Sequence, residues 1–272
     1  MKIEFSQEQI EDIINKYQNE KISATKIGKI YGVSKAPILR VLKENEVEII
    51  QHRHKFEADY NIFENIDSQE KAYWLGFLAA DGCNYERQYN ASIILNIHQK
   101  DRDHLEKFRA FMKSNVKIID YIQDVGFSNN TPMCKITFNS KKMSADLTDK
   151  GVVPNKSLVL QKPNISEEYY LSFILGYFDG DGSISRTNQY NNFSISIQGT
   201  KEMLEWINSI LNISSHLEKR TQNEKNNFYI RCGGTLKPYK ILKQLYEKSP
   251  VCLTRKFLIY KELETVVINE KS

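Results

Sequence analysis

The feature that most constrains this chain is an apolar segment that ends on Asp-Gly and occurs twice. The first copy, residues 73–82, reads YWLGFLAADG, and the second, residues 173–182, reads FILGYFDGDG. A single Asp-Gly after an apolar run is an ordinary turn. Two copies in matching apolar frames, one hundred residues apart, predict that the chain contains two copies of one structural unit.

The stretches that follow the two segments also repeat in the same order. Each copy continues with an alternating apolar and polar stretch, a helical pattern, a second alternating stretch and a second helical pattern. These stretches lie at 91–98, 101–112, 133–139 and 141–151 in the first copy, and at 192–198, 201–211, 228–233 and 236–248 in the second. The order predicts an α+β fold of two pseudo-symmetric units, which we place at residues 68–162 and 163–266.

Residues 1–48 lie outside the repeat and read as a small all-α domain. Ser6 is a candidate N-cap of a first helix. Two short helical patterns follow, joined by a turn at Gly32, with Ser34 as the N-cap of the last one. Two short helices joined by a glycine-containing turn predict a helix-turn-helix.

The distribution of charge supports a DNA-binding role for this domain. Residues 21–43 carry six basic side chains and no acid, whereas the flanks 1–20 and 44–48 carry eight acids. The positive charge therefore lies on the part that would face phosphates. A helical hairpin with a solvated basic face is the alternative. The predicted DNA-binding residues of this domain are Lys26, Lys35, Arg40 and Lys43.

Residues 49–67 show no clear period and are predicted to be a linker. It either lies along DNA or connects the domains through solvent. The basic residues that would contact DNA are His52, Arg53, His54 and Lys55.

Composition excludes several other classes of protein. The four cysteines are scattered without a C-x-x-C pair, which argues against a zinc module. With no signal-peptide pattern, we expect a reducing, cytoplasmic compartment. The longest apolar runs are about eight residues and a membrane helix needs about twenty, so no membrane partner is expected. The net charge of +4 permits a nucleic-acid partner without requiring one.

The two apolar segments carry small residues spaced four apart, namely Gly76 and Ala80 in the first and Gly176 and Gly180 in the second. If both segments are helices, these residues lie on one face and let the two backbones pack closely, which brings the helix ends together. The glycines that follow, Gly82 and Gly182, are expected in the left-handed conformation that closes a helix.

Each of these helices would end on a carboxylate, Asp81 or Asp181. The macrodipole disfavours a carboxylate at a helix C-terminus by up to about 1 kcal/mol, and two such carboxylates repel each other. A divalent cation reverses both effects, because carboxylate, water and phosphate oxygens are the ligands of Mg²⁺. The pair therefore predicts a metal centre that acts on a phosphodiester. Two ordinary Asp-Gly turns after core helices are the alternative.

The segments WLGFLAADG and ILGYFDGDG resemble the two signature motifs of the LAGLIDADG homing endonucleases in their single-chain form, and the resemblance spans about residues 68–265. It implies a pair of αββαββα units whose two sheets form a saddle over duplex DNA, with the signature helices at the centre. It also implies that Mg²⁺, or Mn²⁺ in its place, binds at Asp81, Asp181, Gly82 and Gly182.

The resemblance extends to one more motif position, to a pair of lysines and to a glutamine with its counterpart. The acid two places before the motif's end is present as Asp179 but is Ala79 in the first copy, and no loss of catalysis is expected from this. Lys156 and Lys256 lie where the family often places a basic residue near the scissile phosphate, which stabilises developing charge or polarises water. A surface lysine closing a strand is the alternative. Gln198 resembles a glutamine that positions water, with Asn96 or His98 as its counterpart.

The alternation at 91–98 and 192–198 predicts which residues meet DNA. The apolar positions are expected to face the helices, namely Ile93, Leu95, Ile97, Ile195 and Ile197. Their polar neighbours would face the saddle and read base edges or meet phosphates. The predicted contacts of the two units are Asn96, His98, Lys135, Arg186, Ser194, Ser196, Arg220, Lys225 and Arg231. A polar sheet face without a ligand is the alternative.

These features together predict a monomeric, site-specific, Mg²⁺-dependent DNA endonuclease encoded by a mobile genetic element. It would make a double-strand break in a long asymmetric site, with each acid serving one strand. The first alternative is a DNA-binding regulator that lost the chemistry, which retention of both acids disfavours. The second is an intron RNA maturase, which the helix-turn-helix disfavours because A-form RNA hides its major groove.

Overall fold

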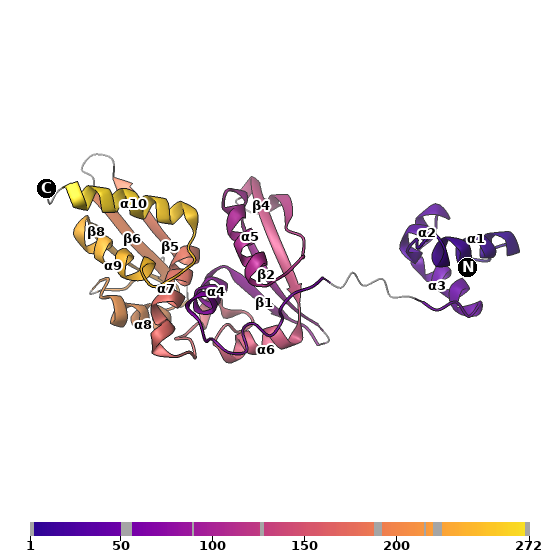
Figure 1. Ribbon diagram of the computed structural model, residues 1–272, viewed down its shortest axis with the longest axis horizontal. Helices are drawn as coiled ribbons and strands as arrows, with labels where there is room; N and C mark the ends of the chain where they lie inside the picture. Colours follow the sequence, from indigo (N-terminus) through magenta and orange to yellow (C-terminus); the bar gives the residue numbers. More distant parts are fainter. Residues whose placement is uncertain are drawn as a thin grey trace. The chain divides into compact units, whose positions relative to one another are not determined.

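The computed structural model describes residues 3–49, 56–88, 90–125, 128–187, 192–214, 216–219 and 225–269. The chain divides into two compact units, 1–55 and 56–272 (Figure 1). Residues 52–55 and 220, which the sequence suggested as DNA contacts, lie outside the described part.

The described part of the first unit contains three helices, α1 (Gln7–Gln18), α2 (Ala24–Ile30) and α3 (Lys35–Glu44). Ser6 caps α1 in a capping box, as predicted, and Gly32 has the left-handed φ of +67° that its turn requires. Ser34 holds the N-cap position of α3, but its side chain makes no capping hydrogen bond. Ile13, Ile27, Ile38 and Leu42 are fully buried, so the helices enclose a small core of their own.

The second unit contains the two repeats, each in the predicted order of helix, strand pair, helix, strand pair and helix. The first consists of α4 (Gln69–Ala80), β1 (Gly82–Glu86), β2 (Ala91–His98), α5 (Arg102–Phe111), β3 (Ile119–Val125), β4 (Ser128–Asn139) and α6 (Lys141–Asp149). The second consists of α7 (Tyr170–Asp181), β5 (Gly182–Thr187), β6 (Asn192–Gly199), α8 (Lys201–Leu211), β7 (Glu218–Lys219), β8 (Phe228–Gly234) and α9 (Leu236–Tyr246). A last helix, α10 (Thr254–Asn269), follows.

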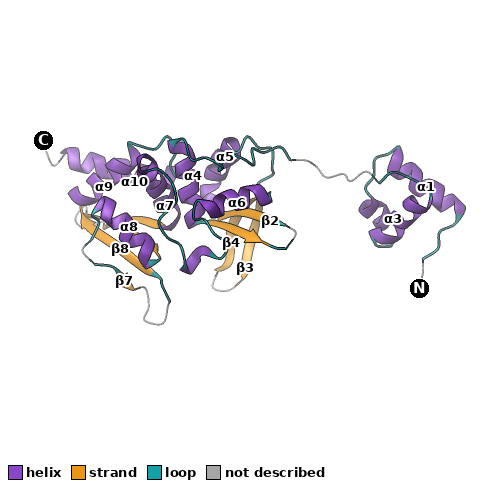
Figure 2. Ribbon diagram, turned by 90° about the horizontal axis from the view of Figure 1, so that it is seen from below, coloured by secondary structure: helices purple, strands orange, loops and turns teal. Residues whose placement is uncertain are grey.

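Each repeat builds one four-stranded antiparallel sheet, with the strand orders β1-β2-β4-β3 and β5-β6-β8-β7. Figure 2 shows the helices of this unit on one side of the two sheets. The predicted inward residues of β2 and β6, from Ile93 to Ile197, are buried in the single core that the helices cover. We call the opposite, helix-free face of both sheets the open face.

The predicted linker 49–67 is wrong in its second half. Residues 56–67 pack on the second unit, where Phe63 is fully buried and its ring lies 5.8 Å from that of Phe111. Backbone hydrogen bonds also fasten this segment, including one of 2.9 Å from Asp59 to Met112. The segment has no period because it is an irregular strap held by two buried side chains, Ile62 and Phe63.

Among the described residues, no helix has the length and apolar character needed to cross a membrane.

Candidate functional site

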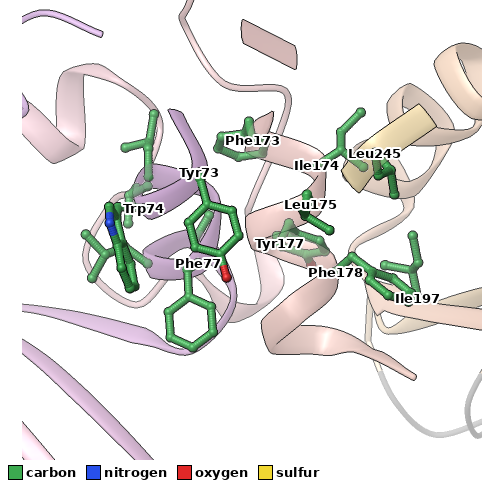
Figure 3. Close-up of a cluster of buried hydrophobic side chains, with 14 of the residues drawn as sticks. Tyr73, Trp74, Phe77, Phe173, Ile174, Leu175, Tyr177, Phe178, Ile197 and Leu245 are labelled. Atoms are coloured by element: carbon green, nitrogen blue, oxygen red, sulfur yellow. The ribbon is translucent and has the colours of Figure 1, made fainter. Parts of the chain in front are cut away.

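The helices α4 and α7 pack against each other, and Figure 3 shows buried side chains of both, among them Tyr73 and Phe173. A Cβ atom on Gly76 would overlap the carbonyl oxygen of Phe173, and one on Gly176 would overlap that of Tyr73. Glycine is therefore required at both positions, because no side chain fits between the two backbones. This contact confirms the predicted packing face and brings the C-terminal ends of the two helices together.

The two aspartates end these helices, but the glycines that follow act differently from the prediction. Gly182 has φ −94° and ψ 167°, an extended conformation, and neither Gly82 nor Gly182 is left-handed. Each glycine begins a strand instead. A Cβ on Gly82 would collide with the carbonyl oxygen of Leu78, and one on Gly182 with that of Phe178. Glycine is needed so that the chain can turn from helix into strand at once.

Asp81 and Asp181 are exposed at their helix ends, although protein atoms surround much of each carboxyl group. The carboxyl carbon of Asp81 lies 3.3 Å from where a Cβ on Gly180 would be, so this acid sits directly against the end of α7. Burial, and then the charge of Asp181, raise the pKa of Asp81 to about 6. Burial also raises the pKa of Asp181, against the effect of Lys156 and Lys256. The pair is thus a local excess of negative charge that a cation would relieve.

Lys156 and Lys256 are buried and neither closes a strand. Lys156 lies in a short 3₁₀ turn at Lys156–Leu158, and Lys256 lies in α10. The Lys256 ammonium donates to the carbonyl oxygens of Phe178, Asp179 and Gly182 at 2.6, 2.8 and 2.6 Å. These three bonds use all of its N–H donors. Burial lowers the pKa of Lys256 to about 8.

Lys156 is engaged differently. Among the described residues, its ammonium donates one hydrogen bond, to the carbonyl oxygen of Ala80 at 2.7 Å. It lines a cavity of about 230 Å³ together with Asp181, Tyr177 and Gln198. Burial lowers the pKa of Lys156, and the charge of Asp181 opposes this more than that of Asp81. Lys156, a residue of the first repeat, therefore interacts more strongly with Asp181 of the second repeat than with Asp81.

Strand register identifies the counterpart of Gln198 as Asn96. Gly82 pairs with Leu95 and Gly182 with Ile197, so the residue after each, Asn96 or Gln198, has the same place in its sheet. The offset here is 102 residues, not 100, because one strand connection differs in length. His98 lies one pair of residues further along β2.

Tyr177 is a site residue that the sequence analysis missed. Its hydroxyl donates to the carbonyl oxygen of Gln198 at 3.0 Å, and the tyrosine lines the same cavity as Asp181. The tyrosine therefore connects the helix that carries Asp181 to the strand that carries Gln198. The corresponding residue of the first repeat is Phe77, so this link exists in one half only. That difference between the copies was the available signal.

A comparison with family models identifies the second repeat. Residues 168–258 match the model of the LAGLIDADG-like domain family. The first repeat has the same order of elements and the same strand order, which the structure shows independently of that match.

A solved structure shows the same fold for the second compact unit as a whole. This unit is similar to the I-LtrWI LAGLIDADG homing endonuclease bound to target DNA, with a TM-score of 0.50, 12% identity, and coverage of 78% of this chain and 91% of that one. The I-SmaMI LAGLIDADG homing endonuclease bound to cleaved DNA gives a TM-score of 0.45, 13% identity, and coverage of 74% and 90%. I-SmaMI bound to uncleaved DNA in the presence of calcium ions gives 0.46, 11%, and coverage of 74% and 92%.

A curated relative is a DNA polymerase of Acanthamoeba polyphaga mimivirus, 23% identical over 185 residues. The match covers 65% of this chain and 10% of that protein, so the chain spans about a tenth of the length of this relative.

The open face of the second unit carries most of the predicted DNA contacts. Asn96 and Lys135 pair across β2 and β4, and Ser196 and Arg231 pair across β6 and β8. Arg186 is the exception, and the prediction for it is wrong. It pairs with the buried Phe193, so it lies on the helix side of the sheet, 3.6 Å from Glu262 of α10. One step of strand alternation separates the two faces.

The first unit presents its predicted basic residues unevenly. Lys26, Lys35 and Lys43 are exposed. Arg40 is half-buried, hydrogen-bonds the carbonyl oxygen of Ile3 and lies 3.9 Å from Glu44. Its guanidinium therefore fastens the N-terminal arm to α3, while the three lysines keep the proposed phosphate-binding role.

A buried polar cluster beside the aspartates explains the difference between Asp179 and Ala79. The Tyr73 hydroxyl donates to Asp179 at 2.6 Å, and the same carboxylate oxygen accepts from the Leu253 backbone at 2.7 Å. His104 Nε2 lies 3.0 Å from that hydroxyl, and burial lowers the pKa of His104 to about 3, so its ring is neutral. At the equivalent positions, the other half has an apolar pair, Phe173 and Ala79.

The first repeat also fastens the segment that leads to Lys256. Arg255 donates twice to Asp101, at 3.0 Å each. Thr254 donates to Asp103 at 2.8 Å, and Lys107 donates to Thr254 at 2.7 Å. Lys256 is therefore positioned by acids of the first repeat as well as by Asp179, a dependence invisible in the sequence because the partners lie about 150 residues apart.

We expect strong coupling between Tyr73 and Asp179. Tyr73→Phe leaves a buried carboxylate with one donor fewer, and Asp179→Ala leaves the tyrosine hydroxyl without its acceptor, so each should cost about 1–3 kcal/mol. The double variant copies the apolar pair of the other half and should cost clearly less than the sum. Urea unfolding of the four proteins measures this coupling. Additive costs would contradict the interaction.

We also expect the stability of Asp81→Asn, relative to wild type, to depend on pH in EDTA. The pKa of Asp81 is about 6 in the folded protein and its ordinary value is 3.8, so the folded state holds this proton more tightly. That contribution is fully present below the ordinary pKa and is lost as pH rises through 6. Asparagine has no proton to lose, so the variant should gain on wild type between pH 4 and pH 7. A difference independent of pH would contradict the raised pKa.

Proposed function

We propose that this protein is a site-specific, metal-dependent endonuclease that breaks both strands of duplex DNA. The observation that carries the proposal is the meeting of Asp81 and Asp181 at the ends of two closely packed helices, at the centre of two sheets with polar open faces. Neither the core nor the helix ends need these two carboxylates, and burial and mutual repulsion disfavour their charges.

The donor set fits a hard divalent cation. Mg²⁺ is commonly held by one or two carboxylates, with water and substrate phosphates as its other ligands, which matches two aspartates on an open surface. The described residues contain no group of three or more His, Cys, Asp and Glu side chains placed to hold a metal, which disfavours an all-protein cage. Gly182 is a poor ligand because its carbonyl oxygen already accepts from Lys256. The carboxylates of Asp81 and Asp181 would hold the ion.

A bound Mg²⁺ supplies Lewis acidity toward the scissile phosphate and its attacking water. The chain's own residues prepare the surroundings. Lys256 has its three N–H groups committed to carbonyl oxygens, so it contributes positive charge and holds the helix end in place. Lys156 lines the cavity beside Asp181, and we expect it to contact a phosphate oxygen there. Gln198 and Tyr177 line the same cavity and would orient water there.

The open face and the first unit would supply the sequence recognition. Polar side chains such as Asn96, Ser196 and Arg231 can contact base edges, and exposed lysines can contact phosphates. The two repeats differ in these residues, so the recognised site would be asymmetric. The exposed lysines of the first unit would add phosphate contacts beyond those of the second unit.

The experiment is to incubate the full-length protein with plasmids that carry candidate sites from around its own gene, in Mg²⁺ and in EDTA. The proposal expects a discrete double-strand break in Mg²⁺ and none in EDTA. Specific binding without a break in Mg²⁺ or Mn²⁺ would favour a regulator. Tighter binding of intron RNA than of DNA of matched length would favour a maturase.

A further inference from the structure

The first row of open-face residues outward from each aspartate has different chemistry in the two repeats. In the first sheet, Cys83 pairs with Ile94, which pairs with Thr137. In the second sheet, the residues at the same places are Ser183, Ser196 and Arg231. The glycines fix this equivalence, because each row begins one residue after the glycine that follows its aspartate. The rows therefore occupy matching positions on either side of the paired aspartates.

In the second sheet, the row of Ser183, Ser196 and Arg231 presents a guanidinium. Arg231 lies 4.7 Å from the ring centre of Tyr229, and its Nε lies 3.5 Å from Glu218. The Tyr229 hydroxyl donates to Glu218 at 2.6 Å, so the glutamate that contacts Arg231 is itself held in place. The side chain of Arg231 is nevertheless 57% exposed. A braced and exposed guanidinium loses little freedom when it binds a planar acceptor pair.

The space beside this guanidinium leads to the metal site. A hollow of about 470 Å³ on the open face is lined by Arg231 and by hydroxyls from four serines, and it reaches Asp181. The small serine side chains leave room for a base edge next to the guanidinium. Among base edges in the major groove, guanine presents two acceptors, O6 and N7, that match a guanidinium.

In the first sheet, the row of Cys83, Ile94 and Thr137 offers no guanidinium. Ile94 and Thr137 are half-buried and Cys83 is exposed, so the row presents the branched alkyl group of isoleucine, the methyl and hydroxyl groups of threonine, and a thiol. Thymine is the base with a methyl group in the major groove, and apolar side chains recognise it by contact.

We infer that the two repeats read opposite classes of base beside the cleavage centre. The row of Cys83, Ile94 and Thr137 takes a thymine through its methyl group. The row of Ser183, Ser196 and Arg231 takes a guanine through the guanidinium. This inference rests on the proposed function, and it adds a geometric requirement: the two bases lie at equal distances on opposite sides of the midpoint of the site.

The test uses full-length protein in EDTA to select bound duplexes from a randomised library. Wild type should enrich a thymine and a guanine at mirror-related positions. The double variant Ile94→Ser with Thr137→Arg copies Ser196 and Arg231 into the matching places of the first sheet. It should change the thymine preference to guanine by roughly tenfold to a hundredfold, and make this pair of positions palindromic. Arg231→Ala should lose the guanine preference at its own position alone.

Two further measurements keep the test decisive. Ile122→Ser is the matched control, because Ile122 is an exposed residue on the opposite face of the same sheet and should leave every preference unchanged. Deoxyuridine in place of the thymine removes one methyl group from the DNA, so wild type should bind about fourfold more weakly. This measurement needs no variant to fold.

The outcomes separate the inference from the proposed function. An enriched site whose mirror-related positions ignore both the row exchange and the deoxyuridine would overturn the inference and leave the nuclease proposal intact. A library in which no sequence is enriched would overturn both, because a protein without sequence preference cannot be a site-specific nuclease.

Discussion

Asp181→Asn is expected to abolish double-strand cleavage, with a loss of at least about a thousandfold, while DNA affinity stays near that of wild type. Asparagine has the shape of aspartate but no charge, so the metal site loses half of its carboxylate ligands. The two carboxylates are close enough for the charge of Asp181 to raise the pKa of Asp81. We therefore expect the pair to act as one unit, so that Asp81→Asn behaves in the same way.

The measurement is the rate of supercoiled plasmid loss on the identified site, with strand-resolved products. Asp149→Asn is the control, because this carboxylate is largely exposed on α6, where it pairs with the neighbouring Lys150. Cleavage at the wild-type rate by Asp181→Asn would show that the metal-site assignment is wrong. A product cut in one strand would show instead that each carboxylate serves one strand by itself.

Gly176→Ala is expected to destabilise the protein by at least about 3 kcal/mol, a large effect for one methyl group. Its Cβ would fall on the carbonyl oxygen of Tyr73, and its next neighbours are backbone atoms of the same helix. Backbone cannot rotate away as a side chain can, so α4 and α7 must separate. That separation would also move the two aspartates apart and weaken cleavage.

Urea unfolding measures this effect, with Gly233→Ala as the matched control. The nearest atom to a Cβ on Gly233 is 3.9 Å away, an ordinary contact, and this glycine does not have a positive φ. The control should change stability by less than about 1 kcal/mol. Equal effects at the two glycines would mean that the helix contact is not as close as described.

The sequence predicts the architecture well, because its period is carried by local residues. The strand at 91–98 has the predicted bounds, and the small residues of α4 and α7 meet as expected. The repeat also predicts that Asp81 and Asp181 come together. Each of these features depends on short-range alternation or on a duplicated motif, which a single sequence displays.

The features that the sequence does not predict depend on contacts across long separations. The prediction for Arg186 is wrong because its pairing with the buried Phe193 places it on the helix side of the sheet. Its partner Glu262 lies far along the chain, on α10. Lys256 was expected near the scissile phosphate, but its ammonium is buried and donates to three carbonyl oxygens. The Tyr73–Asp179 pair had a visible signal, since both residues change together to Phe173 and Ala79 in the other copy.

Bound Mn²⁺, measured by electron paramagnetic resonance on the complex of the full-length protein with its DNA site, tests the central claim most directly. The paired aspartates are proposed to exist in order to hold a divalent cation at the phosphodiester. Wild type should bind Mn²⁺ that the double variant Asp81→Asn with Asp181→Asn does not bind, while both proteins bind the DNA. Equal Mn²⁺ binding by the two complexes would contradict the account.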